Sequence, residues 1–426
     1  MKVIYDISVL GNGYYHHSAR TGVFRVIENL AIALKRSESL DLSFCAHNTF
    51  LQLIQTVKYL ESSPDLGNVE LYDSDNNIHN LIIARLRHLY PKPVAMESPT
   101  FFHKVFNFYL EVLIKSFKLS FINIDAKTLI NTDIFHSTFY ALPRDWKNAR
   151  TVKRFISIYD LIPILYPQYM KFIKSNWLRN VVKSIQPDDW VISISHATKN
   201  DLCNYADIDP KKIFVTHPAA SDMFYYCSDE KQIANARKQY RIPDGPYVLS
   251  LSTLEPRKNI DHTIRCFARM VQEQHIGDLN LVLVGTMGWD FNKIFEEISN
   301  YSPMRDHIIL TGYVADRDLA AIYSGASMFV YPSFYEGFGL PPLEAMQCGV
   351  PVITSNTSSL PEVVGDAGIR VDPSDSDALC QSMYKLYMTP SLRAEMSLKS
   401  LERAKLFSWD KCAQDTISAY ETALRN

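Results

Sequence analysis

Six short apolar segments alternate with helix-like segments in the C-terminal half of the chain, and this alternation restricts the fold most strongly. The segments are YVLSLS, LNLVLVG, HIILTG, MFVYPS, PVITSN and GIRVDP, which begin at Tyr247, Leu279, His307, Met328, Pro351 and Gly368. Strands that alternate with helices form a parallel sheet, because each helix returns the chain to the same edge. The sequence therefore predicts a doubly wound, Rossmann-like domain that lacks the glycines of a dinucleotide site.

The N-terminal half repeats the strand-and-loop pattern less clearly, and a chain of 426 residues is long enough for two domains. Four apolar runs, DIFHS, RFISIYDL, WVISIS and KIFVTHP, end in polar residues. In open α/β sheets ligands bind beyond the carboxyl ends of strands. The sequence places His136, Tyr159, Asp160 and His196 at such ends, and we expect them to face a ligand.

The predicted domain boundaries follow from composition. Residues 221–246 are polar and end in Pro and Gly, which is typical of a linker. We expect an N-terminal domain over residues 1–220 and a C-terminal domain over residues 247–405. A last helix, residues 406–426, is expected to pack back toward the N-terminal domain.

The segment from Tyr331 to Pro351 has the features of a binding site. A buried strand leads into a Gly-Phe-Gly turn, and Pro341 and Pro342 then suit the first turn of a helix. Such a helix start offers unpaired N–H groups to an anion. Glu336 and Glu344 flank the turn, and we place Glu344 in the first turn of the helix. The alternative is a solvated loop acid at Glu336 and a carboxylate at Glu344 that only stabilises the helix.

A second candidate site follows the first strand of the C-terminal domain, in the segment LEPRKN. Arg257 and Lys258 are predicted to open a helix there, so two cations and a helix N-terminus would meet at a strand end. Taken alone, this segment is better explained as a capped helix with surface charges. The Gly-Phe-Gly turn in the same sheet favours a phosphate site, because both features would face one crevice.

Composition excludes several classes of function. The net charge is −2, so no global field attracts nucleic acid. The seven cysteines are scattered without the spacing of a zinc site and are expected to be reduced thiols. The chain enters a strand at once and has no long apolar run, which predicts no signal peptide and no membrane span.

Three segments combine basic and aromatic residues at helical spacing: residues 82–92, 101–121 and 170–185. Such helices suit an anionic membrane surface. Buried helices whose lysines extend to solvent explain the same pattern. The sequence leaves both alternatives open, so the expected location is the cytoplasm, either free or peripheral at the inner face of the membrane.

The chain resembles glycosyltransferase family 4, the retaining glycosyltransferases of the GT-B fold, and in particular bacterial polysaccharide-biosynthesis glycosyltransferases. The segments that carry the resemblance are EPRKN, LVLVG, TGYV, EGFGLPPLEAMQCGVPVI and LPEVVGDAG. The resemblance implies two Rossmann-like domains facing each other across a cleft. It also implies transfer of a hexose from a nucleotide-diphosphate sugar to a glycan or lipid-linked acceptor in surface polysaccharide synthesis. UDP-glucose is the first choice of donor and GDP-mannose the second.

The resemblance assigns roles to individual residues. It implies that Glu336 lies by the donor sugar and that Glu344 accepts hydrogen bonds from the ribose. Arg257 and Lys258 would neutralise the diphosphate, so no metal or other cofactor is expected. Further substrate contacts are implied for the first-domain loop, the strand ends and the Gly-Phe-Gly turn, at Gly22, Ser252, Thr253, Gly285, Gly337, Phe338, Gly339 and Leu340.

Two positions depart from the family pattern. Ser252 or Thr253 stands where many relatives have an arginine. Tyr159 precedes Asp160 where many relatives have histidine, and a tyrosine with an ordinary pKa of about 10 is a poor base. We include Tyr159, Asp160 and the nearby His136 among the predicted catalytic residues. The alternative function is a catalytically degenerate GT-B subunit that binds a sugar nucleotide or a partner enzyme without turnover.

Overall fold

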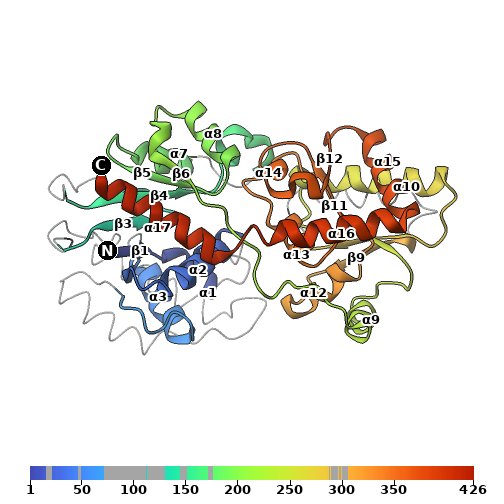
Figure 1. Cartoon of the computed structure of the whole chain (residues 1–426), viewed down its shortest axis with the longest axis horizontal. Coiled ribbons are helices and arrows are strands. Elements are labelled where there is room, and N and C mark those ends of the chain that lie inside the picture. The colour runs from blue at the N-terminus through green and yellow to red at the C-terminus, as the bar shows by residue number, and fades with distance from the viewer. Residues whose placement is uncertain are drawn as a thin grey trace.

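The computed structural model contains two parallel six-stranded sheets, each covered by helices and joined by two crossings of the chain (Figure 1). It describes residues 1–15, 22–46, 49–71, 131–143, 151–170, 176–286 and 306–426, with residues 112, 129, 288, 296 and 299. The predicted basic segments at 82–92 and 101–121 lie outside the described residues, apart from residue 112. Across the part of the chain that is described, no helix combines the length and the apolar character needed to span a bilayer.

The C-terminal sheet confirms the strand prediction. Its strands are β7 (Tyr247–Leu251), β8 (Asn280–Val284), β9 (Ile308–Gly312), β10 (Met328–Tyr331), β11 (Val352–Ser355) and β12 (Ile369–Val371). They are parallel in the order β12-β11-β10-β7-β8-β9. The order reverses between β7 and β10, which is where the crevice of a doubly wound sheet opens. The four central strands β7, β8, β10 and β11 are buried on both faces, as their apolar sequences require, whereas the edge strands β9 and β12 are partly exposed.

The N-terminal sheet is also parallel, in the order β2-β1-β3-β4-β5-β6. Its strands are β1 (Lys2–Asp6), β2 (Asp41–Cys45), β3 (Ile134–Ser137), β4 (Lys153–Ile158), β5 (Trp190–Ser193) and β6 (Ile213–Val215). The helices of this half are α1 (Ser8–Tyr15), α2 (Gly22–Lys35), α3 (Phe50–Ser62), α6 (Ile162–Leu165), α7 (Asn176–Ser184) and α8 (His196–Tyr205). In α7, Leu178, Val181 and Val182 are buried in the core of this half.

Seven helices of the C-terminal half lie within the described residues. They are α9 (Glu230–Gln239), α10 (Ile260–Glu273), α12 (Asp316–Ser324), α13 (Leu340–Gln347), α14 (Leu360–Val364), α15 (Ser376–Met388) and α16 (Pro390–Ala404). The segment predicted as a linker contains α9, which is tied to α12 by a hydrogen bond from the Tyr240 hydroxyl to Asp318. We therefore describe residues 216–229 as the first crossing between the sheets.

The last helix, α17 (Trp409–Arg425), returns to the N-terminal half, and both chain ends lie on that side of the molecule (Figure 1). Ala419, Tyr420 and Ala423 of α17 are fully buried against residues of β1, β3 and β4. The Tyr420 ring packs edge-on against Phe155, with ring centroids 4.9 Å apart. The second crossing, residues 405–408, thus leads from α16 on one sheet to α17 on the other.

Candidate active site

A cleft of about 520 Å³ opens between the two halves, where the order of the C-terminal sheet reverses. The segments after β7 and β10 form one wall, and α2 with the end of β4 forms part of the other. Nearly all predicted site residues line this cleft: Gly22, Tyr159, Asp160, Ser252, Thr253, Arg257, Lys258, Gly285, Glu336, Gly337, Phe338, Gly339, Leu340 and Glu344. The cleft therefore brings together residues that are more than 300 positions apart in the chain, such as Gly22 and Glu344.

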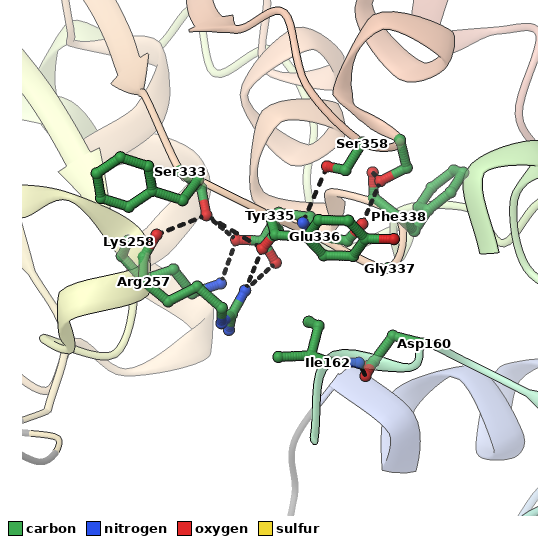
Figure 2. Close-up of polar contacts among 12 residues, drawn as sticks. Asp160, Ile162, Arg257, Lys258, Ser333, Tyr335, Glu336, Gly337, Phe338 and Ser358 are labelled. Atoms are coloured by element: carbon green, nitrogen blue, oxygen red, sulfur yellow. Dashed lines mark hydrogen bonds and ion pairs between the residues drawn. The ribbon is translucent and has the colours of Figure 1, made fainter. Parts of the chain in front are cut away.

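Arg257 and Lys258 lie in a single 3-10 turn, Pro256–Lys258, and not at the start of an α-helix as predicted. Asn259 adopts a left-handed conformation after this turn, and α10 begins at Ile260. The turn directs both cations toward Glu336, as Figure 2 shows. The Nη1 of Arg257 is 2.8 Å from Glu336 Oε2, and the Nζ of Lys258 is 2.7 Å from Glu336 Oε1.

Glu255 completes a buried group of four charges. Its Oε1 is 2.7 Å from the Nη2 of Arg257. Two cations and two carboxylates give this group, Glu255, Arg257, Lys258 and Glu336, a formal charge of zero. Burial alone would raise the pKa of Glu336, but Arg257 and Lys258 outweigh it and lower this pKa to about 2. Burial lowers the pKa of Lys258, and the neighbouring Arg257 adds to the shift.

The hydrogen bonds of Glu336 limit what its carboxylate can accept from a ligand. Oε1 receives hydrogen bonds from Lys258, from the Tyr331 hydroxyl at 3.0 Å and from the Ser333 hydroxyl at 2.6 Å. Oε2 contacts Arg257. A carboxylate offers about four acceptor positions, two on each oxygen. Oε1 is saturated, so the one remaining position on Oε2 is available for a sugar hydroxyl.

Hydroxyl groups fix the carbonyl side of the loop from Glu336 to Phe338. The Ser359 hydroxyl lies 2.9 Å from the carbonyl oxygen of Glu336 and 2.7 Å from that of Phe338. The Ser195 hydroxyl, from the N-terminal half, donates to the carbonyl of Gly337 at 2.6 Å. The carbonyls are therefore satisfied on the side away from the cleft, and the loop is held by both halves of the protein.

The same loop has unused donors. Among the described residues, the backbone N–H groups of Gly337, Phe338 and Gly339 have no hydrogen-bond acceptor, and they precede the N-terminus of α13. Gly339 has a φ of +113°, which a side chain would disfavour. A Cβ on Gly337 would come within 2.4 Å of the carbonyl oxygen of Tyr159, so only glycine allows this approach. This arrangement suits an anion at the helix start.

Two buried side-chain donors on the β7 side of the cleft also lack a partner within the described residues. They are the hydroxyl of Ser252 and the Nε–H of Arg257. Buried donors in folded proteins are nearly always paired, and a buried donor without a partner costs about 1–3 kcal/mol. Because both residues line the cleft, phosphate oxygens of a ligand would satisfy them.

The other end of the cleft is closed by Arg25, which the sequence reasoning missed. Its Nη1 lies 3.4 Å from Glu344 Oε1, and its Nη2 lies 3.5 Å from Asp316 Oδ1. The Tyr323 hydroxyl donates to Glu344 Oε2 at 3.1 Å. Arg25 follows Gly22 by three residues, so its place in the first turn of a helix already assigned to the cleft was the signal that could have identified it.

Glu344 is the fifth residue of α13, beyond the first turn in which it was predicted. The helix terminus therefore does not hold it in the charged state. Burial raises the pKa of Glu344 to about 7, although Arg25 and the Tyr323 hydroxyl oppose the shift. The prediction that Pro341 and Pro342 lie in the first turn of α13 is confirmed. Gly349, with φ of +73°, follows the end of the helix.

Tyr159 and Asp160 belong to the N-terminal wall of the cleft, and Figure 2 shows Asp160 across from Glu336. The Asp160 carboxylate accepts a hydrogen bond from the backbone N–H of Ile162 at 2.9 Å. Burial raises the pKa of Asp160 and also raises that of Tyr159 well above its usual value. Tyr159 therefore stays neutral at physiological pH and acts as a wall of the cleft and as a packing surface for Gly337.

His136 does not face the cleft, and its predicted place among the catalytic residues is corrected. It lies within β3, fully buried beneath α17. Its Nδ1 is 2.5 Å from the Tyr420 hydroxyl, and its Nε2 is 2.9 Å from the Ser157 hydroxyl. Burial lowers its pKa to about 3. A strand residue one position before the end points to the core as readily as to the ligand, and the sequence did not distinguish the two.

Comparison with known proteins identifies relatives that carry out one type of chemistry. The family model described as "Glycosyl transferases group 1" matches residues 232–403. The chain is 33% identical over 289 residues to the O-antigen chain mannosyltransferase B of Escherichia coli, covering 68% of this chain and 74% of that protein. It is 29% identical over 301 residues to the serotype-specific mannosyltransferase WbdA of Escherichia coli, covering 68% of this chain and 36% of that protein, about a third of its length.

Solved structures share the fold over nearly the whole chain. Sucrose-phosphate synthase from Thermosynechococcus elongatus superposes with a TM-score of 0.65 at 18% identity, over 99% of this chain and 98% of that one. The HepE protein of Anabaena, solved in complex with UDP and glucose, has a TM-score of 0.62 at 15% identity, over 99% and 100% of the two chains. At these identities the likeness concerns the fold alone.

Proposed function

The chain belongs to the glycosyl transferases of group 1 and has the GT-B fold, and from this premise we propose that it transfers a hexose from a nucleotide-diphosphate sugar to a growing surface polysaccharide. The proposal rests on the unpaired hydrogen-bond donors at the end of the cleft where we expect the diphosphate to bind. Unpartnered N–H groups before α13, the Ser252 hydroxyl and the Arg257 Nε–H belong to residues that line the same cleft as the charge group around Glu336.

The proposed reaction transfers the sugar to the acceptor and releases the diphosphate beside Arg257 and Lys258. The bond from the anomeric carbon to the diphosphate oxygen breaks, and the nucleoside diphosphate leaves with the electron pair. An acceptor hydroxyl attacks on the same face, and its proton passes to an oxygen of the departing diphosphate, so the anomeric configuration is retained. Arg257, Lys258 and the α13 N–H groups stabilise the charge that develops on the leaving group. This arrangement needs no metal.

The remaining predicted contacts keep the roles that we proposed from the family resemblance. Glu344, at the Arg25 end, would accept hydrogen bonds from the ribose, and Gly22 and Gly285 allow the nucleotide to approach the backbone. The names of the two Escherichia coli relatives favour mannose as the sugar. We therefore propose GDP-mannose ahead of UDP-glucose, which reverses the order of preference drawn from the sequence. The acceptor is proposed to be a glycan or a lipid-linked saccharide.

A panel of nucleotide sugars tests the proposal. The protein is incubated with GDP-mannose, UDP-glucose, UDP-galactose or ADP-glucose in the presence of EDTA, and release of the nucleoside diphosphate is measured with and without a mannose-containing acceptor. We expect acceptor-dependent release with one donor. Lys258→Met should abolish it, whereas Lys385→Met, at an exposed position of α15 outside the cleft, should not. Binding of a donor without any release would instead support the non-catalytic subunit, and dependence on an added metal would refute the metal-free mechanism.

Association with an anionic membrane surface stays a prediction. Most of the basic segments that suggest it lie outside the described residues, and the described part of the third segment, α7, places its apolar side chains in the protein core. Flotation of the protein with anionic vesicles, repeated at high salt, would test it.

A further inference from the structure

Three side chains that bind metals in other proteins meet at the junction of the two halves, outside the cleft. His196 is the first residue of α8, His217 follows β6 at the first crossing, and Glu362 lies on α14. One nitrogen of each histidine and one carboxylate oxygen all lie within 4.8 Å of one another. The two imidazole rings have centroids 5.7 Å apart, and His217 Nε2 is 3.2 Å from Glu362 Oε2.

The hydrogen bonds of Glu362 leave room for a further ligand. Its Oε2 accepts from the backbone N–H of His196 at 2.9 Å, and its Oε1 accepts from that of Ala197 at 3.1 Å. These bonds use about two of the four acceptor positions of the carboxylate and fix its orientation. Within the described residues, no hydrogen bond engages the exposed ring of His196. The exposed His196 imidazole can therefore turn toward an ion shared with His217 while the carboxylate stays in place.

We propose that His196, His217 and Glu362 bind Zn²⁺, with water as the fourth ligand. Two imidazole nitrogens and one carboxylate oxygen form a ligand set that suits zinc, and tetrahedral geometry with bonds of about 2.0 Å requires donor atoms about 3.3 Å apart. The His217–Glu362 pair already has this spacing, and rotation of the exposed His196 side chain brings the third donor in. Mg²⁺ prefers oxygen ligands in octahedral geometry and is not expected to bind.

The site would join the two halves at the point where the chain crosses between them. His217 also packs against Phe338 and Phe407, with ring centroids 5.9 Å and 5.8 Å away. Phe338 belongs to the loop from Glu336 to Phe338, which we call the donor loop, and Phe407 lies in the second crossing. Ser195, which precedes His196, holds the carbonyl of Gly337. A bound Zn²⁺ would therefore restrict the movement of the two halves around the donor loop, and we expect it to slow turnover. The expected slowing of turnover rests on the proposed function, whereas zinc binding itself does not.

Zinc binding is measured first, without any assay of turnover. The full chain, free of affinity tags and stripped with EDTA, is titrated with ZnCl₂ in competition with a chromogenic zinc indicator. We expect one Zn²⁺ per chain in the micromolar range, weakened on the order of tenfold or more in His196→Ala and His217→Ala. His275→Asn removes an exposed histidine at the end of α10 and serves as the matched control. Thermal unfolding in EDTA checks that each variant is folded.

His196→Ala is the decisive variant, because its exposed ring contributes little to the core, whereas His217→Ala also removes packing on Phe338. Equal zinc affinity in wild type and His196→Ala would overturn the site, as would competition by Mg²⁺ or the absence of binding at 100 µM ZnCl₂. Nucleotide release is then measured with and without zinc. Slower release in wild type but not in His196→Ala supports the coupling, and equal release refutes it while the binding result is unaffected.

Discussion

Binding of the nucleotide should depend on pH through Glu344. The carboxylate must be ionised to accept hydrogen bonds from two ribose hydroxyls, because a protonated carboxyl has one oxygen that is itself a donor. In the free protein burial raises the pKa of Glu344 to about 7, with Arg25 and the Tyr323 hydroxyl opposing the shift and Asp316 adding to it. At neutral pH about half of the molecules therefore have to lose a proton before the nucleotide binds.

The size of the effect follows from this pKa. Below pH 7 the ionised fraction falls tenfold for each pH unit, so affinity that depends on ionised Glu344 should fall about 30-fold between pH 8.5 and pH 5.5. The phosphate of a nucleoside diphosphate also gains a proton in this range and weakens binding by itself. Glu344→Gln retains that contribution and lacks the carboxylate, so the ratio of the two dissociation constants isolates Glu344.

The assay is calorimetric titration with GDP and with UDP, at constant ionic strength, across pH 5.5 to 8.5. We expect the advantage of wild type over Glu344→Gln to shrink by about 30-fold as the pH falls. Arg25→Met removes the cation that holds the pKa of Glu344 down, so it should move the midpoint of this change to higher pH. A ratio that stays constant across the pH range would refute the assignment of Glu344 to the ribose.

Four further outcomes follow from contacts in the structure. Glu336→Gln leaves Arg257 and Lys258 buried with one carboxylate, so denaturant unfolding should show a loss of about 3–5 kcal/mol, part of which GDP restores. Gly337→Ala places a Cβ 2.4 Å from the Tyr159 carbonyl oxygen, so the backbone must shift; it should slow transfer by roughly 10²-fold in steady-state kinetics and also lower the free energy of unfolding. His136→Ala should lower the unfolding free energy by about 2–4 kcal/mol and leave the Kd for GDP unchanged. The pKa of Glu344 is higher in the folded protein than its ordinary value, so the free energy of unfolding should fall by about 3 kcal/mol as the pH rises from about 4.5 to about 7. Denaturant unfolding measured across this pH range should show the fall in wild type and not in Glu344→Gln.

The sequence predicted the C-terminal sheet well because its central strands are buried on both faces. In the strand Asn280–Val284, the four residues after Asn280 are all apolar, and this pattern is visible without knowledge of its neighbours. The strand ends then identified the cleft, since parallel strands bring their carboxyl ends to one edge. The same reasoning failed for His136, because a single position at a strand end decides between core and cleft, and packing under α17 made that choice.

The local conformation of Pro256–Lys258, the turn that contains both cations, could not be predicted from the sequence alone. Arg257 and Lys258 after a proline suit the first turn of an α-helix, and the left-handed Asn259 that interrupts this helix depends on tertiary contacts. Its side-chain amide donates to the carbonyl oxygens of Pro332 and Pro373, which come from two other loops. Arg25 was missed for a related reason, because its partner Glu344 lies 319 positions away and no spacing rule joins them.

The internal pairing of the cleft charges also changes how the nucleotide is expected to bind. If Arg257 and Lys258 were free, a diphosphate would gain from two uncompensated cations, but Glu255 and Glu336 already neutralise them. Attraction must then come from donors without partners, namely the Ser252 hydroxyl, the Arg257 Nε–H and the N–H groups before α13. Such donors lose little on binding, since they give up no existing hydrogen bond in the protein. The charge group instead becomes important when the leaving diphosphate gains charge, because Glu336 already holds both cations in place and they need no reorganisation. Glu336→Gln would leave the two cations with one carboxylate, so it should slow transfer without weakening the binding of the diphosphate.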